Sequence, residues 1–329
     1  MSGTSRLTGL DLDGAPGGGT AGAAAGLIAT GVEAVLARRR FNDIVLDYDP
    51  IERVLFCEFA YSGRPCFTGD VLREALEAQR VARSFFGDAD AGEAPVRYLV
   101  LSSRVTGVWS LGADLAFCAG LIRNRDRAGL RHYAHACCDL AFTYATGLGF
   151  DLPVVSVALV QGDAIGSGFE TALACNLIVA EKSARFGLPE ILFNLFPGMG
   201  GLSFLARRIA PGLAERLIRS GEVYGAEQLH ALGAVDVLAA DGKGVAAFYD
   251  FIGPKGCGFA AQRALYRARR LVNPVSLEEM TRIADLWVEA AVALEESDLQ
   301  RMLRLLAAQE RRGFKSIEGN HHFAMIRSN

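Results

Sequence analysis

The chain has 329 residues, of which 51% are hydrophobic and 22% are charged, a composition typical of a globular protein with a large buried core. Its formal net charge of −3 excludes the strong basic field that drives non-specific nucleic-acid binding. The seven cysteines show no CxxC spacing, which indicates reduced thiols in a cytoplasmic protein and argues against a zinc site.

Residues 1–40 form an N-terminal extension. Residues 1 to about 25 are rich in Gly, Ala, Ser and Thr, which predicts disorder because such a segment buries little apolar surface. The extension has no basic start and is too short and polar to cross a bilayer, so we expect neither export nor membrane insertion.

Residues 41–240 alternate between strand and helix patterns. The runs "NDIVLDYDP" and "RVLFCEFAY" predict two strands of a hairpin, and "GDVLREALEAQRVARSFFGD" predicts a helix. The apolar runs "VRYLVLSS", "VVSVALVQG" and "CNLIVAE" are typical of strands buried on both faces. Residues 115–147 keep helical periodicity, with Gly120 and Gly129 as the expected points of division.

Residues 241–329 predict a helical C-terminal region. Its longest helical pattern begins at "SLEEMTRIADLWVEAA", and the expected break lies near Ser297. The fold class is therefore α/β, with a helical part after the core.

Two glutamates stand out in "GDAIGSGFETALACNLIVAEKSARFGLPE". Glu170 follows the glycines that end a strand and open a helix, where unpaired N–H groups favour an oxyanion. Glu190 follows Pro189 and precedes an apolar run, where burial would raise its pKa into a range useful for proton transfer. The alternatives are a first-turn dipole partner for Glu170 and a surface helix cap for Glu190. A short helix and a returning strand between them allow both carboxyls to reach one site.

These residues resemble the crotonase (enoyl-CoA hydratase/isomerase) superfamily, through "GDAIGSGFE", "GLPEI", "FPGMGG" and the preceding "WSLGADLAF". The segments "LVQGDA", "NRDRAGLRHYA" and "SLEEMTRIADLWVEAA" are more similar to its diffusible-signal-factor synthase subfamily. The resemblance covers about residues 41–312. It implies a spiral of ββα units with a helical C-terminal region, assembled as a homotrimer or a hexamer.

The resemblance also implies site residues. The backbone N–H groups of Ala113 and Ser167 would form an oxyanion hole, although the family usually has glycine in place of Ser167. Trp287 and Leu305 would line an acyl pocket, whereas helical spacing alone also fits ordinary core packing.

The implied reaction is dehydration of a 3-hydroxyacyl thioester on an acyl carrier protein. Glu190 would remove the α-proton while Glu170 assists departure of the β-hydroxyl. Thioester hydrolysis would then release a cis-2-enoic acid, a quorum-sensing signal. The alternatives are a CoA-dependent enoyl-CoA hydratase or isomerase of fatty-acid degradation, and a non-catalytic partner of a sensor kinase receiver domain.

No cofactor is expected beyond the phosphopantetheine of acyl carrier protein or CoA that carries the substrate. His132, His135 and Asp139 share a helix face, but without a fourth ligand we interpret them as surface polar residues and predict no metal. The sequence has no P-loop, so nucleoside triphosphate chemistry is not expected.

Overall fold

Two β-sheets form the centre of the molecule in the computed structural model, which describes residues 31–86, 94–254, 256 and 258–311. The predicted disorder of residues 1 to about 25 lies outside these residues. The larger sheet has the order β1-β2-β3-β5-β7-β10 and the smaller has the order β4-β6-β8-β9. The strands are β1 (Ile44–Asp49), β2 (Val54–Phe59), β3 (Tyr98–Ser103), β4 (Val108–Ser110), β5 (Val155–Val160), β6 (Asp163–Ile165), β7 (Leu177–Glu181), β8 (Arg185–Gly187), β9 (Val223–Gly225) and β10 (Val237–Ala239).

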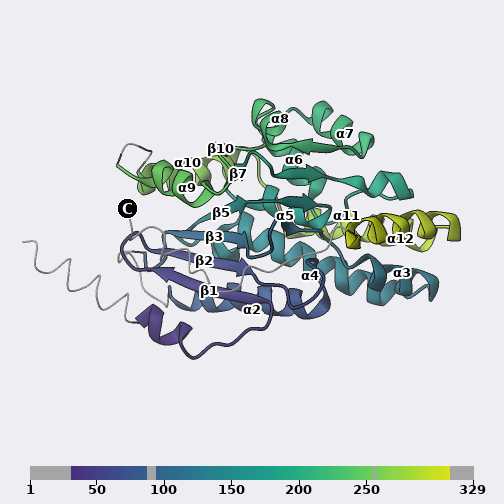
Figure 1. Cartoon of the computed structure of the whole chain (residues 1–329), viewed down its shortest axis with the longest axis horizontal. Coiled ribbons are helices and arrows are strands. Elements are labelled where there is room, and N and C mark those ends of the chain that lie inside the picture. The colour runs from purple at the N-terminus through teal and green to yellow at the C-terminus, as the bar shows by residue number, and fades with distance from the viewer. Residues whose placement is uncertain (1–30, 87–93, 255, 257, 312–329) are drawn as a thin grey trace, which may run out of the picture.

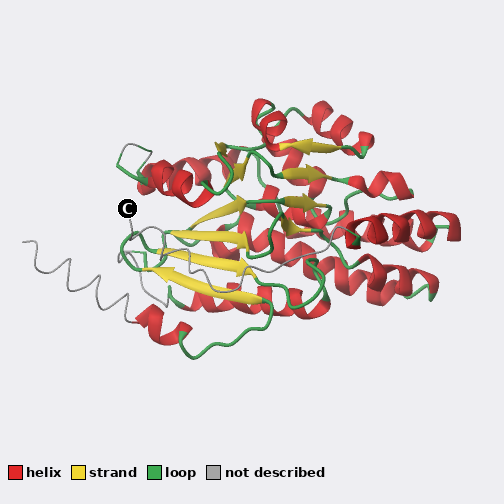
Figure 2. Ribbon diagram, in the orientation of Figure 1, coloured by secondary structure: helices red, strands yellow, loops and turns green. Residues whose placement is uncertain are grey.

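Helices cover both sheets (Figure 2). They are α2 (Gly69–Ser84), α3 (Leu115–Arg123), α4 (Arg127–Ala145), α5 (Ser167–Ala174), α6 (Gly201–Arg208), α7 (Pro211–Ser220), α8 (Ala226–Ala231), α9 (Gly244–Ile252), α10 (Phe259–Val272), α11 (Leu277–Val292) and α12 (Glu296–Glu310). There are also two short helical turns, η1 (Gly147–Asp151) and η2 (Pro189–Phe193), and residues 31–36 are helical. In Figure 1, α9 and α10 lie at one end of the molecule, and α3 and α12 extend at the other.

The chain winds as a spiral of repeated units. In each unit the first strand joins the larger sheet, the second joins the smaller sheet, and a helix or helical turn follows: β3-β4-α3, β5-β6-α5 and β7-β8-η2. The first strands of successive units pair in parallel, and β4, β6 and β8 do the same in the smaller sheet. The predicted α/β spiral with a helical C-terminal region is confirmed.

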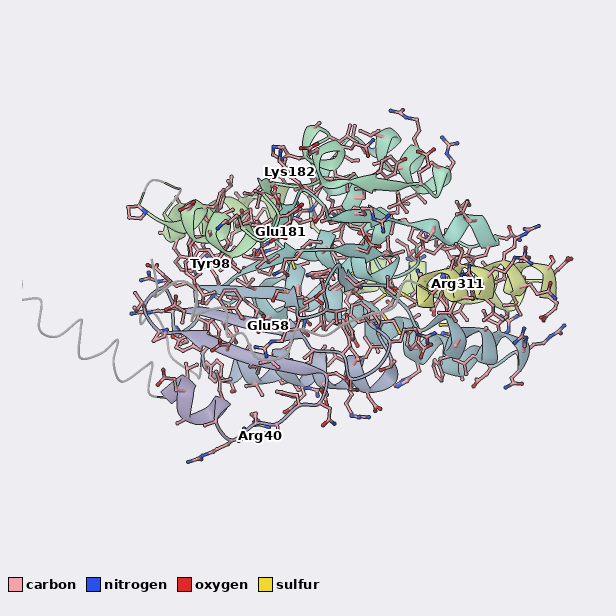
Figure 3. All side chains as sticks on the ribbon, in the orientation of Figure 1. Arg40, Glu58, Tyr98, Glu181, Lys182 and Arg311 are labelled. Atoms are coloured by element: carbon pink, nitrogen blue, oxygen red, sulfur yellow. The ribbon has the colours of Figure 1, made fainter. Side chains whose placement is uncertain are left out.

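The predicted strands match the observed ones closely. Strands β3, β5 and β7 are buried at every residue, as their continuous apolar runs predict for strands covered on both faces. β1 and β2 pair antiparallel as a hairpin. A second, smaller core cluster lies beneath α9 and α10, where Tyr98 meets the ring of Phe248 edge to face; Figure 3 shows Tyr98 at the end of the molecule away from Arg311.

One of the two predicted helix breaks lies elsewhere than expected. The segment 115–147 divides at residues 124–126, between Gly120 and Gly129, which both lie inside helices. Arg125 there takes a positive φ of 51°, and the Asp126 carboxylate accepts the N–H of Gly129 and so starts α4 as an N-cap. In the C-terminal region the break between α11 and α12 falls at residues 293–295, near Ser297 as expected.

Among the described residues, no helix is both long enough and apolar enough to span a membrane.

Gly162 and Gly107 lie where the chain passes from the larger sheet to the smaller one, and their backbones pack closely against each other. A Cβ atom on Gly162 would lie 2.2 Å from the carbonyl carbon of Gly107 and 2.4 Å from the nitrogen of Val108. These are backbone atoms of β4 and its preceding turn, so a side chain at position 162 cannot be accommodated by a rotamer change.

We therefore expect Gly162→Ala to lower the free energy of unfolding by about 1–3 kcal/mol, the usual cost of overpacking. Gly212→Ala in α7 is the matched control, because nothing lies within 4 Å of its added Cβ. The control should be neutral or stabilising by up to about 1 kcal/mol, since alanine favours helix. Chemical denaturation of the three proteins measures both effects, and equal stability of the two variants would contradict the packing argument.

Candidate active site

One cleft brings together all six residues that the sequence singles out. It encloses about 620 Å³ of space not filled by atoms, at the point where α5 and η2 meet the C-terminal helices α11 and α12. Its lining includes Ala113, Ser167, Glu170, Glu190, Trp287 and Leu305. These residues come from five separate parts of the chain, so the fold is what makes them neighbours.

A close backbone contact places Ala113 beside Ser167. A Cβ on Gly112 would lie 2.4 Å from the carbonyl oxygen of Ile165 and 2.7 Å from the nitrogen of Ser167, and Gly112 has a φ of +81°. Glycine is therefore required here both by space and by conformation. The contact brings the segment before α3 and the turn before α5 to one wall of the cleft, as an oxyanion hole built from two N–H groups needs.

Ser167 is the first residue of α5, so its N–H has no acceptor within the helix and lies at the positive end of the helix dipole. The expected departure from glycine fits this geometry, since Ser167 has a helical conformation. Its hydroxyl donates to the sulfur of Met199 at 3.0 Å, and only 3% of the residue is exposed. The serine side chain is therefore held against the turn 197–201.

Glu170 is almost fully buried, at 1% exposure, and its position is fixed by main-chain donors. Its Oε1 accepts the N–H of Met199 at 2.9 Å and the N–H of Gly201 at 2.7 Å. Burial raises the pKa of Glu170 to about 7, and hydrogen bonds from Gly201, Met199 and Ser167 oppose that rise. These donors favour the carboxylate form.

Glu190 has the opposite environment. It lies in η2 after Pro189, with its Oε1 against the α-carbon of Gly166, where a Cβ would approach it to 2.9 Å. Its Oε2 is shielded from solvent and has no hydrogen-bond partner among the described residues. Burial, and then the negative charge of Glu170, raise the pKa of Glu190 to about 8. The proton of the pair is therefore favoured on Glu190.

The opposite wall of the cleft is apolar and comes from the C-terminal helices. Trp287 of α11 packs so tightly on Gly198 that a Cβ there would lie 2.5 Å from the tryptophan Cβ. Met302 and Leu305 of α12 complete this wall. Trp287 is 5% exposed and therefore contributes to the core as well as to the cleft.

Met199, Gly198 and Gly112 are site residues to which the sequence analysis assigned no role. The segment "FPGMGG" contributes to the resemblance, but its main-chain bonds to Glu170 depend on a contact between distant parts of the chain. A glycine directly before Ala113 was the available signal for the close approach of two backbones.

Within the described parts of the chain, no group of three or more His, Cys, Asp or Glu side chains is arranged to hold a metal ion. His135 instead lies 3.1 Å from Asp285 of α11, which also pairs with Arg131. The six cysteines described are all buried free thiols.

Comparisons with known proteins agree with this architecture. The sequence profile of the enoyl-CoA hydratase/isomerase family matches residues 96–245, which contain both glutamates and both predicted oxyanion-hole residues. This part of the chain is therefore similar to the enoyl-CoA hydratase/isomerase family. Human mitochondrial delta3-delta2-enoyl-CoA isomerase superposes with a TM-score of 0.65 at 18% identity, covering 83% of this chain and 100% of the isomerase. Enoyl-CoA hydratase from Bacillus halodurans gives 0.64 at 19% identity, covering 80% and 100%. At these identities the likeness shows a shared crotonase fold.

Relatives of higher identity match a shorter part of the chain. Mouse mitochondrial methylglutaconyl-CoA hydratase is 33% identical over 162 residues, which are 49% of each chain. The 2,3-dehydroadipyl-CoA hydratase of Escherichia coli K12 is 43% identical over 93 residues, 28% of this chain and 36% of the relative. The chain thus spans about half the length, or less, of these relatives.

The raised pKa values also predict how stability depends on pH. A carboxyl whose pKa is higher in the folded state than in the unfolded state binds more protons when folded, so stability falls as pH rises from its unfolded pKa through its folded pKa. Glu190→Gln removes the carboxyl of the pair whose pKa is raised further. We expect the melting temperature of the wild type to fall more than that of the variant between pH 5 and pH 9, by on the order of a few degrees.

Thermal unfolding followed by circular dichroism measures this difference. Glu215→Gln on the exposed surface of α7 is the control and should follow the wild type. A parallel decline for Glu190→Gln and the wild type would show that Glu190 is not held protonated.

Proposed function

We propose that the protein adds water to, or removes water from, the Cα–Cβ bond of an acyl thioester. The observation that carries this proposal is the contrast between the two carboxyls beside one pair of main-chain N–H groups. Glu170 receives hydrogen bonds that favour its ionised form, whereas Glu190 is shielded, lacks a partner on Oε2 and lies next to that charge. Such a pair can divide the roles of base and acid.

In the hydration direction, the Glu170 carboxylate takes a proton from water while the water oxygen bonds to Cβ. The electrons of the double bond move toward the thioester oxygen, which the N–H groups of Ala113 and Ser167 stabilise as an enolate. Cα then receives the proton of Glu190, and the product is a 3-hydroxyacyl thioester. Dehydration is the reverse, in which Glu190 takes the α-proton and Glu170 protonates the departing hydroxyl. The resting protonation suits the hydration direction, which favours the enoyl hydratase alternative.

The direct test is the loss of the ultraviolet absorbance of an enoyl-CoA in the presence of the protein. Glu170→Gln and Glu190→Gln should each lower kcat by about 10²–10⁴-fold, the usual contribution of a general acid or base. Because Glu170 must be ionised and Glu190 protonated, the wild-type rate should follow a bell-shaped pH profile with limbs near 7 and 8. Glu215→Gln should retain wild-type rates. Retention of activity in either active-site variant would remove that glutamate from the mechanism.

The apolar wall favours a more specific reaction. Trp287, Met302 and Leu305 offer a hydrocarbon chain an apolar surface, and the segment that contains Trp287 resembles signal synthases. We therefore propose that the chain dehydrates a 3-hydroxyacyl group on acyl carrier protein and then hydrolyses the thioester, with water as the attacking group at the carbonyl held by Ala113 and Ser167. The products would be a free cis-2-enoic acid and the carrier thiol. A homotrimer or hexamer and a sensor kinase receiver domain as partner belong to this proposal.

Mass spectrometry of products formed from a 3-hydroxyacyl carrier protein tests the specific reaction. The expected result is a free unsaturated acid from the wild type, with at least about 100-fold less from Glu170→Gln. Formation of an enoyl thioester with no free acid would leave the hydratase function and contradict the synthase function.

A further inference from the structure

A second and larger cleft adjoins the candidate active site. It encloses about 1090 Å³ of space not filled by atoms and lies along the smaller sheet, between strands β4, β6, β8 and β9 and the end of α12. Five residues line both clefts: Leu111, Ile165, Pro189, Leu305 and Gln309. The two clefts are therefore adjacent, with these side chains at their common boundary.

The chemistry of the second cleft suits hydrocarbon. Val108, Leu192 and Val223 contribute apolar surface, and Leu192 and Val223 are 48% and 50% exposed. Large apolar side chains left half exposed at a concave surface are typical of ligand sites. The bound ligand would cover surface that is otherwise in contact with water.

The charges in this cleft argue against the carrier end of a thioester. Among the described residues of its lining, the charged ones are Asp163 and Arg185, which pair with each other through two hydrogen bonds of 2.8 and 2.6 Å. A nucleotide or phosphopantetheine phosphate would need a cation that is not already neutralised by a carboxylate. The occupant that fits is the uncharged, distal end of the acyl group.

We propose that this second cleft binds the distal part of a long acyl chain, and that Leu305 and Gln309 of α12 divide it from the reacting part. The inference rests on the proposed acyl-thioester function and specifies its substrate class as long-chain. A short acyl group would end in the first cleft, at the wall of Trp287 and Met302. A chain of about twelve carbons would continue past Leu305 into the second cleft.

Ala308→Trp tests this proposal because Ala308 lines the second cleft, does not line the first, and is exposed on α12. The indole would fill space without touching Glu170 or Glu190. The matched control is Ala231→Trp, at the exposed end of α8 and outside both clefts.

The measurement is kcat/KM for a four-carbon and a twelve-carbon 2-enoyl-CoA. Excluding about two methylenes from apolar contact corresponds to roughly tenfold in affinity. Ala308→Trp should therefore lower the ratio of twelve-carbon to four-carbon kcat/KM at least tenfold, with the four-carbon rate within about twofold of wild type. Ala231→Trp should leave the ratio unchanged. An unchanged ratio in a folded Ala308→Trp would overturn the proposal.

Binding of saturated acyl-CoAs separates this inference from the proposed catalysis. Dodecanoyl-CoA and butanoyl-CoA have no double bond to hydrate, so calorimetry with them reports binding alone. The wild type should bind the longer chain at least tenfold more tightly than Ala308→Trp does, even if no hydration is detected. Equal binding by the two proteins would count against the second cleft, whereas inactivity on every enoyl-CoA with this binding difference intact would count against the hydratase chemistry alone.

Discussion

The hydrogen bonds from the Met199 and Gly201 N–H groups to Oε1 of Glu170 are the interaction on which the site depends. They join the first turn of α5 to the turn at 197–201, two segments from neighbouring units of the spiral. The same turn carries Gly198, against which Trp287 packs. The two bonds to Oε1 hold the Glu170 carboxylate in place. They also hold the turn against which Trp287 packs. Charge-assisted bonds from main-chain donors suit this role because a main-chain N–H cannot move away by a change of side-chain rotamer.

This arrangement disfavours the ionised form of the other carboxyl, Glu190. Two carboxyls in one cleft cannot both ionise easily, and the main-chain donors of the turn 197–201 are supplied to Glu170. The fold therefore creates chemical asymmetry by the unequal placement of N–H groups, with no cationic side chain among the described residues that line the cleft. The shielded Oε2 of Glu190 is the destabilising consequence, and active sites commonly retain such groups because reactivity requires them.

The strands and the pair of glutamates could be predicted from the sequence because their signals are local. Continuous apolar runs identify β3, β5 and β7, and glycines before Glu170 mark a strand that gives way to a helix. The break at residues 124–126 could not be placed, because the N-cap bond of Asp126 outweighs the low helix propensity of Gly120 and Gly129. Likewise the close approach of Gly112 to the turn before α5 is a contact between units, and spacing along the chain carries no information about it.

The division of each unit between two sheets has a consequence for the lifetime of the site. Because β5 belongs to one sheet and β6 to the other, a whole unit cannot leave the spiral without breaking strand pairing in both sheets. The turn before α5 lies between these two sets of pairs, and its Gly166 N–H donates to the carbonyl of Gly187. Hydrogen exchange of that turn is thereby coupled to the opening of strand pairs, whereas Glu190 lies in η2, outside both sheets.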